Sequence, residues 1–375
     1  MALSGWRANL VALAVGGTVS VLLAEAALQI YNPIPLPVRG QRLILAANTR
    51  EIRRPPFQNP KYDREIPVST NALGFRGPEL PPDPEGWLKI ITIGGSTTEC
   101  HYTADDRTWS ARLHARLAEA RPEVWLNNAG LDGNSTFGHL VLLDQVVAGL
   151  SPDVLLFLVG VNDVSRDGQN DYDANTRRAA RDLIIEKSEL LSTLQVFWRS
   201  FRARDRGLSP PPEFDLTTLP RTEITEPQIE QTLEAHRRRF LDPYAARVRR
   251  LIERARAIGA EPVLITQPSL YGRFTDPTTG VEVRSLQVAG DWSPETAGDN
   301  ADARERILAL YNEVTRKTAA ELGVFAIDLA VEMPKDSALY LDWIHFSNAG
   351  NEKVAEIVAR ALLPHLAGIK PKSAR

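Results

Sequence analysis

Short apolar runs and longer amphipathic segments alternate along the chain from residue 88 to near its end. The runs of strand length are LKIITI, VWLNN, DVLLFLV, PVLITQ and VFAIDLA, and apolar residues recur at helical spacing at about 107–120, 138–149, 243–258, 302–322 and 349–366. LKIITI and DVLLFLV are continuously apolar, which is typical of strands buried on both faces. Strands that alternate with helices in this way form a parallel sheet covered by helices. We therefore predict an α/β fold with five parallel strands.

Before this pattern begins, residues 10–30 (LVALAVGGTVSVLLAEAALQI) are apolar except at four scattered positions. A helix of about 20 apolar residues is long enough to cross the hydrocarbon core of a bilayer. We predict that residues 1–31 form an N-terminal transmembrane anchor. Two alternatives remain open. The small residues of Ala24-Glu25-Ala26 fit a signal-peptide cleavage site, and the segment could also be a buried helix of the soluble domain.

The arginines on either side of this segment give conflicting signals about its orientation. Arg7 before the span favours a cytoplasmic N-terminus under the positive-inside rule. Five arginines follow the span and favour the opposite orientation, at positions 39, 42, 50, 53 and 54. Because long soluble domains translocate largely regardless of charge, we expect the domain after the span to be periplasmic or otherwise extracytoplasmic.

The rest of the chain divides by composition. Residues 32–85 are rich in proline and arginine and lack periodicity, so we predict a tether that lies over the core, with STNALGFRGPEL at 69–80 docked on it. Residues 86–368 form the predicted soluble core. Within the core, the α/β pattern is interrupted at about 164–240 by charged helical stretches and a proline-rich stretch, an insertion in which we expect substrate selectivity to reside. Residues 369–375 form a short basic tail.

Composition excludes some classes of protein. With 43% hydrophobic and 24% charged residues, the chain can bury the core of an ordinary globular protein. A net charge of −3 and a pI near 6.1 give no excess of positive charge for a phosphate backbone, so we expect no nucleic-acid partner. Cys100 is the only cysteine, which excludes an intrachain disulfide and a cysteine-rich zinc site.

Polar residues and glycines follow the predicted strands where a site is expected. Ligands of parallel α/β sheets bind outside the carboxyl ends of the strands. The first predicted strand is followed by Ser96, the second by Gly133 and the third by Asn162, while the loop before the last helix carries Asp342 and His345. The sequence therefore predicts that these five residues lie at one edge of the sheet.

The chemistry of these residues suits acyl transfer. A serine hydroxyl needs an adjacent base to act as a nucleophile at neutral pH, and a histidine held by a carboxylate is the usual base. His345 fits this role, with Asp342 three residues earlier to hold its other ring nitrogen. The backbone N–H groups of Ser96 and Gly133 and the side-chain amide of Asn162 would form an oxyanion hole. We predict a Ser-His-Asp triad with this three-donor hole.

Four sequence blocks carry a resemblance to a known family. GGSTTE with Ser96, NAGLDGNS with Gly133, GVND with Asn162 and DWIH with Asp342 and His345 resemble, in order and spacing, the blocks of the SGNH (GDSL-like) hydrolase superfamily. The resemblance covers about residues 88–366. It implies a flavodoxin-like three-layer α/β/α fold and serine catalysis without a metal or other cofactor. It also implies esterase, lipase, deacetylase or acyltransferase activity on an O- or N-acyl group.

The resemblance extends outside the core and also has a gap. The N-terminal apolar segment and the Asn-x-x-Gly-Phe-Arg-Gly pattern of residues 71–77 resemble the superfamily's membrane-anchored bacterial members. In the serine block, however, the usual aspartate before the serine is Gly95, and the usual leucine after it is Thr97. We expect Glu99 or the docked Arg76 to support the turn in place of the missing aspartate.

Each assigned residue also has a structural alternative. Ser96 and Asp342 could cap helices, Asn162 could form an Asx turn, and Gly133 could serve backbone geometry alone. The expected substrate is an acylated small molecule, lipid or glycan, and the expected partner is the membrane, reached through the N-terminal helix. A different hypothesis is a catalytically silent accessory subunit that uses the same fold to bind a membrane complex.

Overall fold

The computed structural model describes residues 5–34, 36, 38–40, 42–55, 61–166, 180–205, 214–288 and 300–372. Residues 167–179 and 206–213 of the predicted insertion and residues 373–375 of the predicted tail lie outside these ranges. Contacts between residues divide the chain into two units. Unit 1 comprises residues 1–46 and 175–208, and unit 2 comprises residues 47–174 and 209–375. The boundaries proposed from composition stay a prediction.

Unit 2 is built on one five-stranded sheet in the order β6-β5-β7-β8-β9, with every neighbouring pair parallel. Its strands are β5 (Leu88–Gly94), β6 (Val124–Asn128), β7 (Val154–Val159), β8 (Glu261–Thr266) and β9 (Phe325–Ile327). All six side chains of β7 are buried, as the continuously apolar run predicted. The predicted five-stranded parallel sheet is therefore confirmed.

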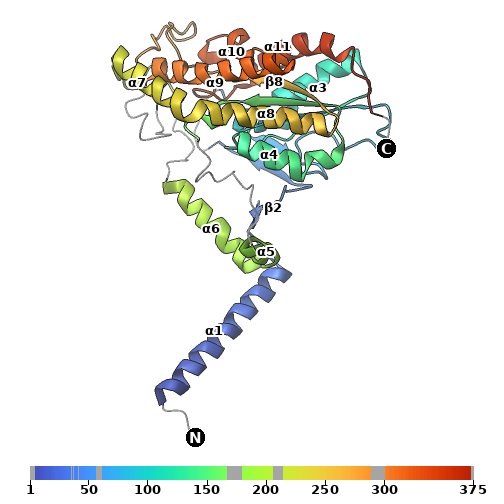
Figure 1. Cartoon of the computed structure of the whole chain (residues 1–375), viewed down its shortest axis with the longest axis vertical. Helices are drawn as coiled ribbons and strands as arrows, with labels where there is room; N and C mark the ends of the chain where they lie inside the picture. The colour runs from blue at the N-terminus through green and yellow to red at the C-terminus, as the bar shows by residue number, and fades with distance from the viewer. Residues whose placement is uncertain are drawn as a thin grey trace. The chain divides into compact units, whose positions relative to one another are not determined.

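Helices cover both faces of this sheet (Figure 1). The long ones are α3 (Trp109–Ala120), α4 (Thr136–Gln145), α8 (Asp242–Ala257), α9 (Ala301–Leu322) and α11 (Asn348–Leu366). α3 packs against α11, while α4 packs against α8, which in turn packs against α9. The architecture is the expected flavodoxin-like α/β/α arrangement.

Unit 2 contains further elements besides the sheet and these five helices. They are the antiparallel pair β3 (Arg50–Arg53) and β4 (Ile66–Ser69), the helices α2 (Ser96–Glu99), α7 (Glu226–His236) and α10 (Leu329–Glu332), and the single turns η1 (Asp105–Arg107), η2 (Val147–Leu150), η3 (Val161–Asp163), η4 (Arg237–Leu241) and η6 (Ser337–Leu339). The last strand is shorter than its apolar run predicted. It ends at Ile327 because Asp328 leaves the sheet to accept hydrogen bonds from Thr266 Oγ1 (2.8 Å) and Arg316 Nε (2.8 Å).

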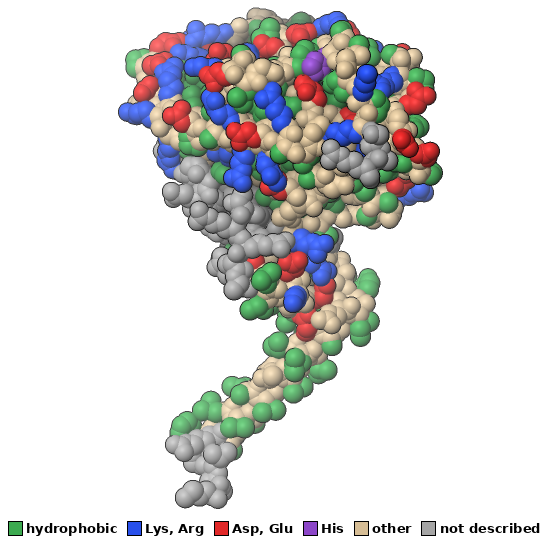
Figure 2. Space-filling model, turned by 45° about the vertical axis from the view of Figure 1, so that its right-hand side comes forward, with side chains coloured by type: hydrophobic (Ala, Val, Ile, Leu, Met, Phe, Trp, Pro, Cys, Tyr) green, Lys and Arg blue, Asp and Glu red, His purple; other side chains and the backbone are tan. Residues whose placement is uncertain are grey.

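Unit 1 consists of α1 (Gly5–Ile30), the short strands β1 (Val38–Arg39) and β2 (Arg42–Leu43), α5 (Ala180–Lys187) and α6 (Glu189–Asp205). Within α1, residues Ala8–Ile30 form a candidate membrane span with a mean hydropathy of 2.0, and none of it is buried against protein. Figure 2 shows hydrophobic side chains along the length of this helix. The interpretation of residues 10–30 as a buried helix is therefore wrong, and a span and a signal sequence both fit.

Candidate active site

Ser96 begins α2 directly after β5, on a turn that only glycine fits. A side-chain carbon on Gly94 would lie 2.1 Å from Thr98 Oγ1, and one on Gly95 would lie 2.0 Å from Asn162 Nδ2. The two glycines thus bring the start of α2 into close contact with the loop after β7. This packing gives a physical reason for Gly95 where the superfamily pattern has aspartate.

The serine lies within hydrogen-bond distance of the predicted base. His345 Nε2 is 2.8 Å from Ser96 Oγ, and His345 Nδ1 is 2.7 Å from Asp342 Oδ2. Asp342 Oδ1 also accepts the backbone N–H groups of Ile344 and His345, each at 2.8 Å. Because the carboxylate accepts a hydrogen bond from Nδ1–H, Nε2 is left as the acceptor for the serine hydroxyl.

Burial and charge oppose each other at this pair. Burial alone would lower the pKa of His345, but the adjacent Asp342 carboxylate outweighs it and raises that pKa above its ordinary value of 6.5. Burial would likewise raise the pKa of Asp342, but the His345 charge and the hydrogen bonds to the carboxylate lower it. The lowered pKa favours the ionised form of Asp342 despite its burial.

The predicted oxyanion donors meet the start of α2 from two loops. Asn162 follows β7 in η3, and its Nδ2 donates to the carbonyl of Asn134 at 3.0 Å. One amide hydrogen is used in this bond, so the second is left for a ligand. Gly133 precedes Asn134 and has a φ of 66°, in the left-handed region that favours glycine. Among the described residues, none accepts a hydrogen bond from the N–H of Ser96 or of Gly133.

A buried ion pair holds the Asn162 loop in place. Asp163 accepts the backbone N–H of Thr136 at 3.2 Å and pairs with Arg247 Nη2 at 3.2 Å, and Arg247 Nε also donates to Thr136 Oγ1 at 2.7 Å. The arginine-rich stretch of residues 247–250 resembles a solvated helix face in the sequence, but Arg247 is only 7% exposed. That interpretation is wrong for Arg247, which lies on the same face of α8 as the buried Tyr244.

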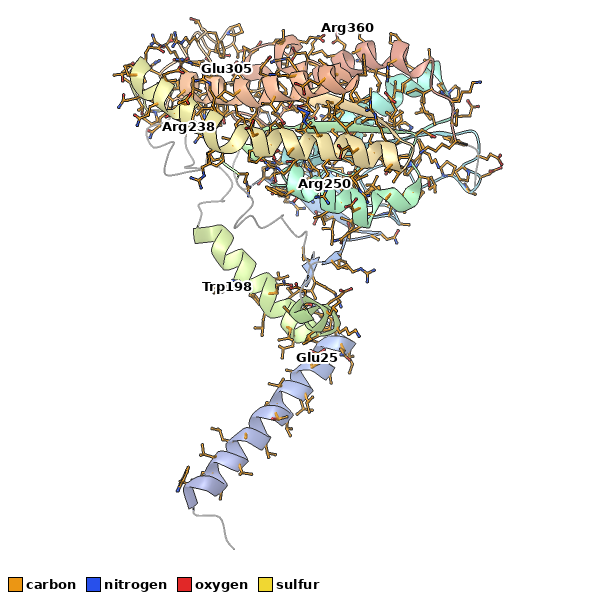
Figure 3. All side chains as sticks on the ribbon, viewed as in Figure 1. Glu25, Trp198, Arg238, Arg250, Glu305 and Arg360 are labelled. Carbon is orange, nitrogen blue, oxygen red and sulfur yellow. The ribbon has the colours of Figure 1, made fainter. Side chains whose placement is uncertain are left out.

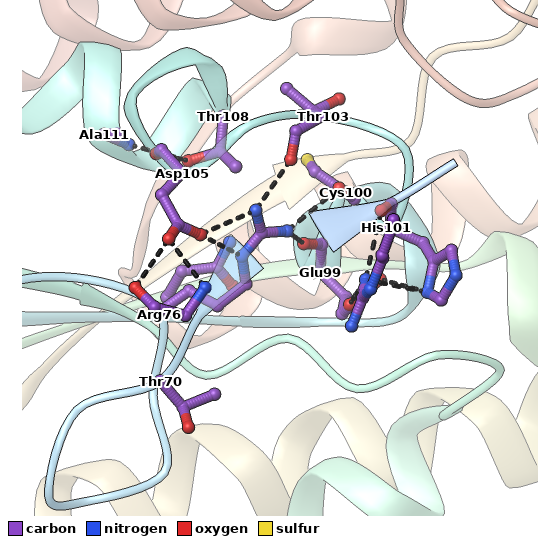
Figure 4. Close-up of polar contacts among 12 residues, drawn as sticks. Thr70, Arg76, Glu99, Cys100, His101, Thr103, Asp105, Thr108 and Ala111 are labelled. Carbon is purple, nitrogen blue, oxygen red and sulfur yellow. Dashed lines mark hydrogen bonds and ion pairs between the residues drawn. The ribbon is translucent and has the colours of Figure 1, made fainter. Parts of the chain in front are cut away.

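Arg76 supports the other side of the turn, as Figure 4 shows. Its Nη1 donates to the carbonyls of Glu99 (2.6 Å) and Cys100 (2.9 Å), and its Nη2 donates to the carbonyl of Thr103 (2.7 Å). Asp105 pairs with the same guanidinium at 2.9 Å. A helix end leaves carbonyls without partners, and a cation there is stabilising. Arg76 is thus the residue that caps α2 from the GFRG segment.

The second departure from the superfamily pattern also has a partner. Thr97 Oγ1 donates to Gln267 Oε1 at 3.0 Å, and Gln267 directly follows β8. The hydroxyl of Thr97 therefore links the serine turn to the end of a strand two places away in the sheet. A leucine could not make this bond.

Residues 61–63, within the predicted tether, contact the site in a way that the sequence did not predict. Lys61 Nζ donates to the carbonyls of Ser337 (2.8 Å) and Tyr340 (3.2 Å), just before the Asp342 loop. Asp63 accepts from Asn348 Nδ2 at 3.0 Å, at the start of α11. These contacts join residues about 280 positions apart in the chain, so no local sequence pattern predicts them. They brace the loop that carries Asp342 and His345.

Two comparisons with known proteins give matches. The model of the GDSL-like Lipase/Acylhydrolase family matches residues 92–353. Among solved structures, the chain is similar to Axe2, an acetylxylan esterase from Geobacillus stearothermophilus, with 17% identity, a TM-score of 0.41, and coverage of 75% of this chain and 96% of that one. It is similar to the acetyl xylan esterase AlAXEase with 15% identity, a TM-score of 0.42, and coverage of 73% and 99%.

A third similar structure is LAE5, described as an alpha/beta hydrolase enzyme from the metagenome of Lake Arreo, Spain. Here the identity is 17%, the TM-score is 0.41, and the match covers 73% of this chain and 94% of that one. No curated protein matches the chain. Since the family model matches more than half of the chain and its match includes Ser96 and His345, the chain belongs to the GDSL-like lipase/acylhydrolase family.

Proposed function

We propose that the chain cleaves or transfers an acyl group through Ser96, His345 and Asp342. The observation that carries this proposal is the continuous line of hydrogen bonds from Ser96 Oγ to His345 Nε2 and from His345 Nδ1 to Asp342 Oδ2. His345 takes the hydroxyl proton as Ser96 Oγ attacks the acyl carbonyl. The imidazolium then gives this proton to the leaving alcohol or amine, which departs and leaves an acyl-enzyme.

The oxyanion of each tetrahedral intermediate is held by Asn162 Nδ2 and by the N–H groups of Ser96 and Gly133. The hydrogen bond from Asn162 to the carbonyl of Asn134 supports this role, because it fixes the amide while one of its hydrogens remains available. The start of α2 adds a local positive potential where negative charge develops.

The acceptor of the acyl group decides between two reactions. Attack of water on the acyl-enzyme gives an esterase or deacetylase, which the lipase/acylhydrolase family supports. Attack of a sugar hydroxyl gives a carbohydrate O-acyltransferase, and both reactions use the same triad. Product analysis after incubation with an activated acetyl ester, with and without an added glycan acceptor, separates them: hydrolysis yields free acetate, and transfer yields an acetylated glycan.

We also propose that α1 is retained as a membrane anchor and that unit 2 is extracytoplasmic. Support for retention comes from Glu25, whose carboxylate accepts hydrogen bonds from Ser188 Oγ (2.7 Å), Glu189 N (3.0 Å) and Leu190 N (2.9 Å). Cleavage after Ala26 would remove Glu25 and leave these donors at the start of α6 without their acceptor.

Labelling of the full chain with a fluorophosphonate probe, read by intact mass, tests the triad. We expect one adduct on the native chain and none on Ser96→Ala or His345→Ala. His114→Ala is the matched control, because the His114 ring lies on α3 and bonds to the carbonyl of Val124. It should be labelled like the native chain.

The opposite result would favour the accessory-subunit hypothesis. A folded native chain that takes up no probe would show that Ser96 is not activated, and the triad would be rejected. An adduct that survives Ser96→Ala would place the reactive group elsewhere.

A further inference from the structure

Helix α6 of unit 1 exposes a large apolar face, which we define as Leu191, Leu194, Phe197 and Trp198. Leu194 is 54% exposed, Phe197 57% and Trp198 62%. Leu191, Leu194 and Trp198 recur at helical spacing, so they lie along one side of the helix. Soluble monomeric proteins rarely expose large contiguous apolar patches, and such patches commonly mark an interaction site.

Polar contacts within unit 1 hold the sides of α6 that flank the apolar face. Gln195 forms two hydrogen bonds with the backbone of Gly40, one to the carbonyl and one from the N–H, both at 3.0 Å. Thr193 Oγ1 accepts from Asn32 Nδ2 at 3.0 Å, and Glu189 pairs with Arg39 at 2.5 Å. These contacts fix the rotation of the helix about its axis, and the four apolar side chains between and beside them stay exposed.

The start of α6 is tied to the last turns of α1. Glu25 lies five residues before the end of α1 (Figure 3). Its carboxylate accepts the first two N–H groups of α6 and therefore caps that helix. An α-helix rises about 1.5 Å per residue, so the 26 residues of α1 extend for roughly 39 Å. The hydrocarbon core is about 30 Å thick, so the ends of a helix this long reach the headgroup region.

We propose that α6 lies at the surface of the same bilayer that α1 crosses, with its apolar face in the boundary between lipid headgroups and acyl chains. This inference rests on α1 being a membrane span. The cap by Glu25 joins the start of α6 to the last two turns of the candidate span, near the end of α1 that reaches the headgroup region. The apolar face therefore lies on a helix that begins beside an apolar helix that is not buried in protein. Tryptophan and phenylalanine are typical of this boundary, and interfacial helices bury one apolar face about 5–10 Å deep in it. The stretch that interrupts the α/β pattern thereby gains a role as a second membrane contact.

Site-specific fluorescence on the full chain in liposomes tests the inference. Leu194→Cys places a single reactive thiol on the apolar face for an environment-sensitive dye. Cys100 needs no replacement, because it is buried and its burial raises the pKa of its thiol to about 12, which keeps it unreactive near neutral pH. Val19→Cys, near the middle of the candidate span, reports on α1, and Arg238→Cys, on a 71% exposed side chain of unit 2, is the water-exposed control.

Lipids that carry a nitroxide near the top of the acyl chain are expected to quench the Leu194 label by roughly twofold, because interfacial helices insert to that depth. The Arg238 label should be unaffected. A label at Val19 should be quenched by nitroxides near the bilayer centre, which establishes the span independently.

Three other outcomes would overturn the inference, and they differ in what they mean. A quenched Val19 label with a Leu194 label that emits as in water would show that the face is solvated. A Leu194 label with apolar emission but no quenching by lipid nitroxides would show that protein covers the face, either a second copy of the chain or another part of the same one. An unquenched Val19 label would reject the span itself together with the inference, while leaving the triad untouched.

Discussion

Polar side chains are buried at the edge of the sheet in unit 2, whereas apolar side chains are exposed on the helices of unit 1. At the sheet edge, the polar groups of Ser96 and Arg76 are almost fully buried and paired with other protein groups. In unit 1, polar contacts such as those of Glu25 join the helices, while apolar side chains such as Val19 and Leu194 are exposed. These buried side chains of unit 2 are satisfied within the protein, whereas unit 1 exposes apolar surface, which is unfavourable in water.

The largest expected effect is at the carboxylate that orients the base. Asp342→Asn should reduce kcat by roughly 10⁴-fold, because an amide favours the wrong tautomer of His345 and does not stabilise its cation. Protonated His345 cannot act as a base, so the native rate should fall as the pH drops through the pKa of His345. Because this pKa is raised, the acid limb of the pH profile should lie above pH 6.5. In the variant, the largest charge that opposes the effect of burial is removed, so the pKa of His345 should fall and the limb should move to lower pH. The pH profile of aryl acetate hydrolysis measures both; an unchanged limb would mean that Asp342 does not control His345.

Removal of one oxyanion donor should have the next largest effect. Asn162→Ala is expected to lower kcat by about 10²- to 10³-fold with little change in KM. Thr232→Ala is the control, because the Thr232 hydroxyl bonds to the carbonyl of Gln228 within α7 and takes no part in the oxyanion hole. A loss confined to KM would show that Asn162 binds substrate equally well in the ground state and the transition state.

Gly95→Ala tests the same oxyanion donor, because it displaces the side-chain amide of Asn162 without removing it. The new methyl group would lie 2.0 Å from Asn162 Nδ2, so the amide must move. We expect a loss of kcat similar to that of Asn162→Ala, and a double variant no slower than about threefold below the worse single variant, since both changes remove one interaction. Multiplied losses in the double variant would contradict the proposed coupling.

The sequence predicts the sheet edge well because its signals are local. The runs of β5 and β7 are continuously apolar, and Ser96 and Asn162 closely follow these two strands, so both residues could be predicted from their positions. The burial of Arg247 could also have been predicted locally, because Arg247 lies three residues after Tyr244 on the buried side of α8. Its charge suggested a solvated position instead. The contacts of Lys61 had no such signal, because they join segments far apart in the chain. The contacts between α1 and α6 are likewise long-range. The sequence also does not state whether the apolar face of α6 lies in water or in lipid, so its role could not be predicted.

Arg76 offers a stability test of the sheet edge. Arg76→Met should lower the free energy of unfolding by roughly 3 kcal/mol, because it leaves buried carbonyls and Asp105 without their cationic donor. Arg54→Met is the matched control, since Arg54 forms an exposed pair with Glu65 that is worth less than about 1 kcal/mol. Urea unfolding of the full chain in detergent measures both. Equal losses would mean that Arg76 acts only as a surface charge.

The smallest effect is expected on the apolar face of α6. Leu194→Ala should change the unfolding free energy by less than about 0.5 kcal/mol in detergent, because its side chain is exposed and leaves no cavity in protein. Leu155→Ala, at a fully buried position of β7, should cost about 2–5 kcal/mol. The two variants make the same chemical change, so their difference reports burial against protein alone. Similar losses at both positions would show that Leu194 is packed against protein in solution, and the contrast between the two units would then disappear together with the reason to place α6 in lipid.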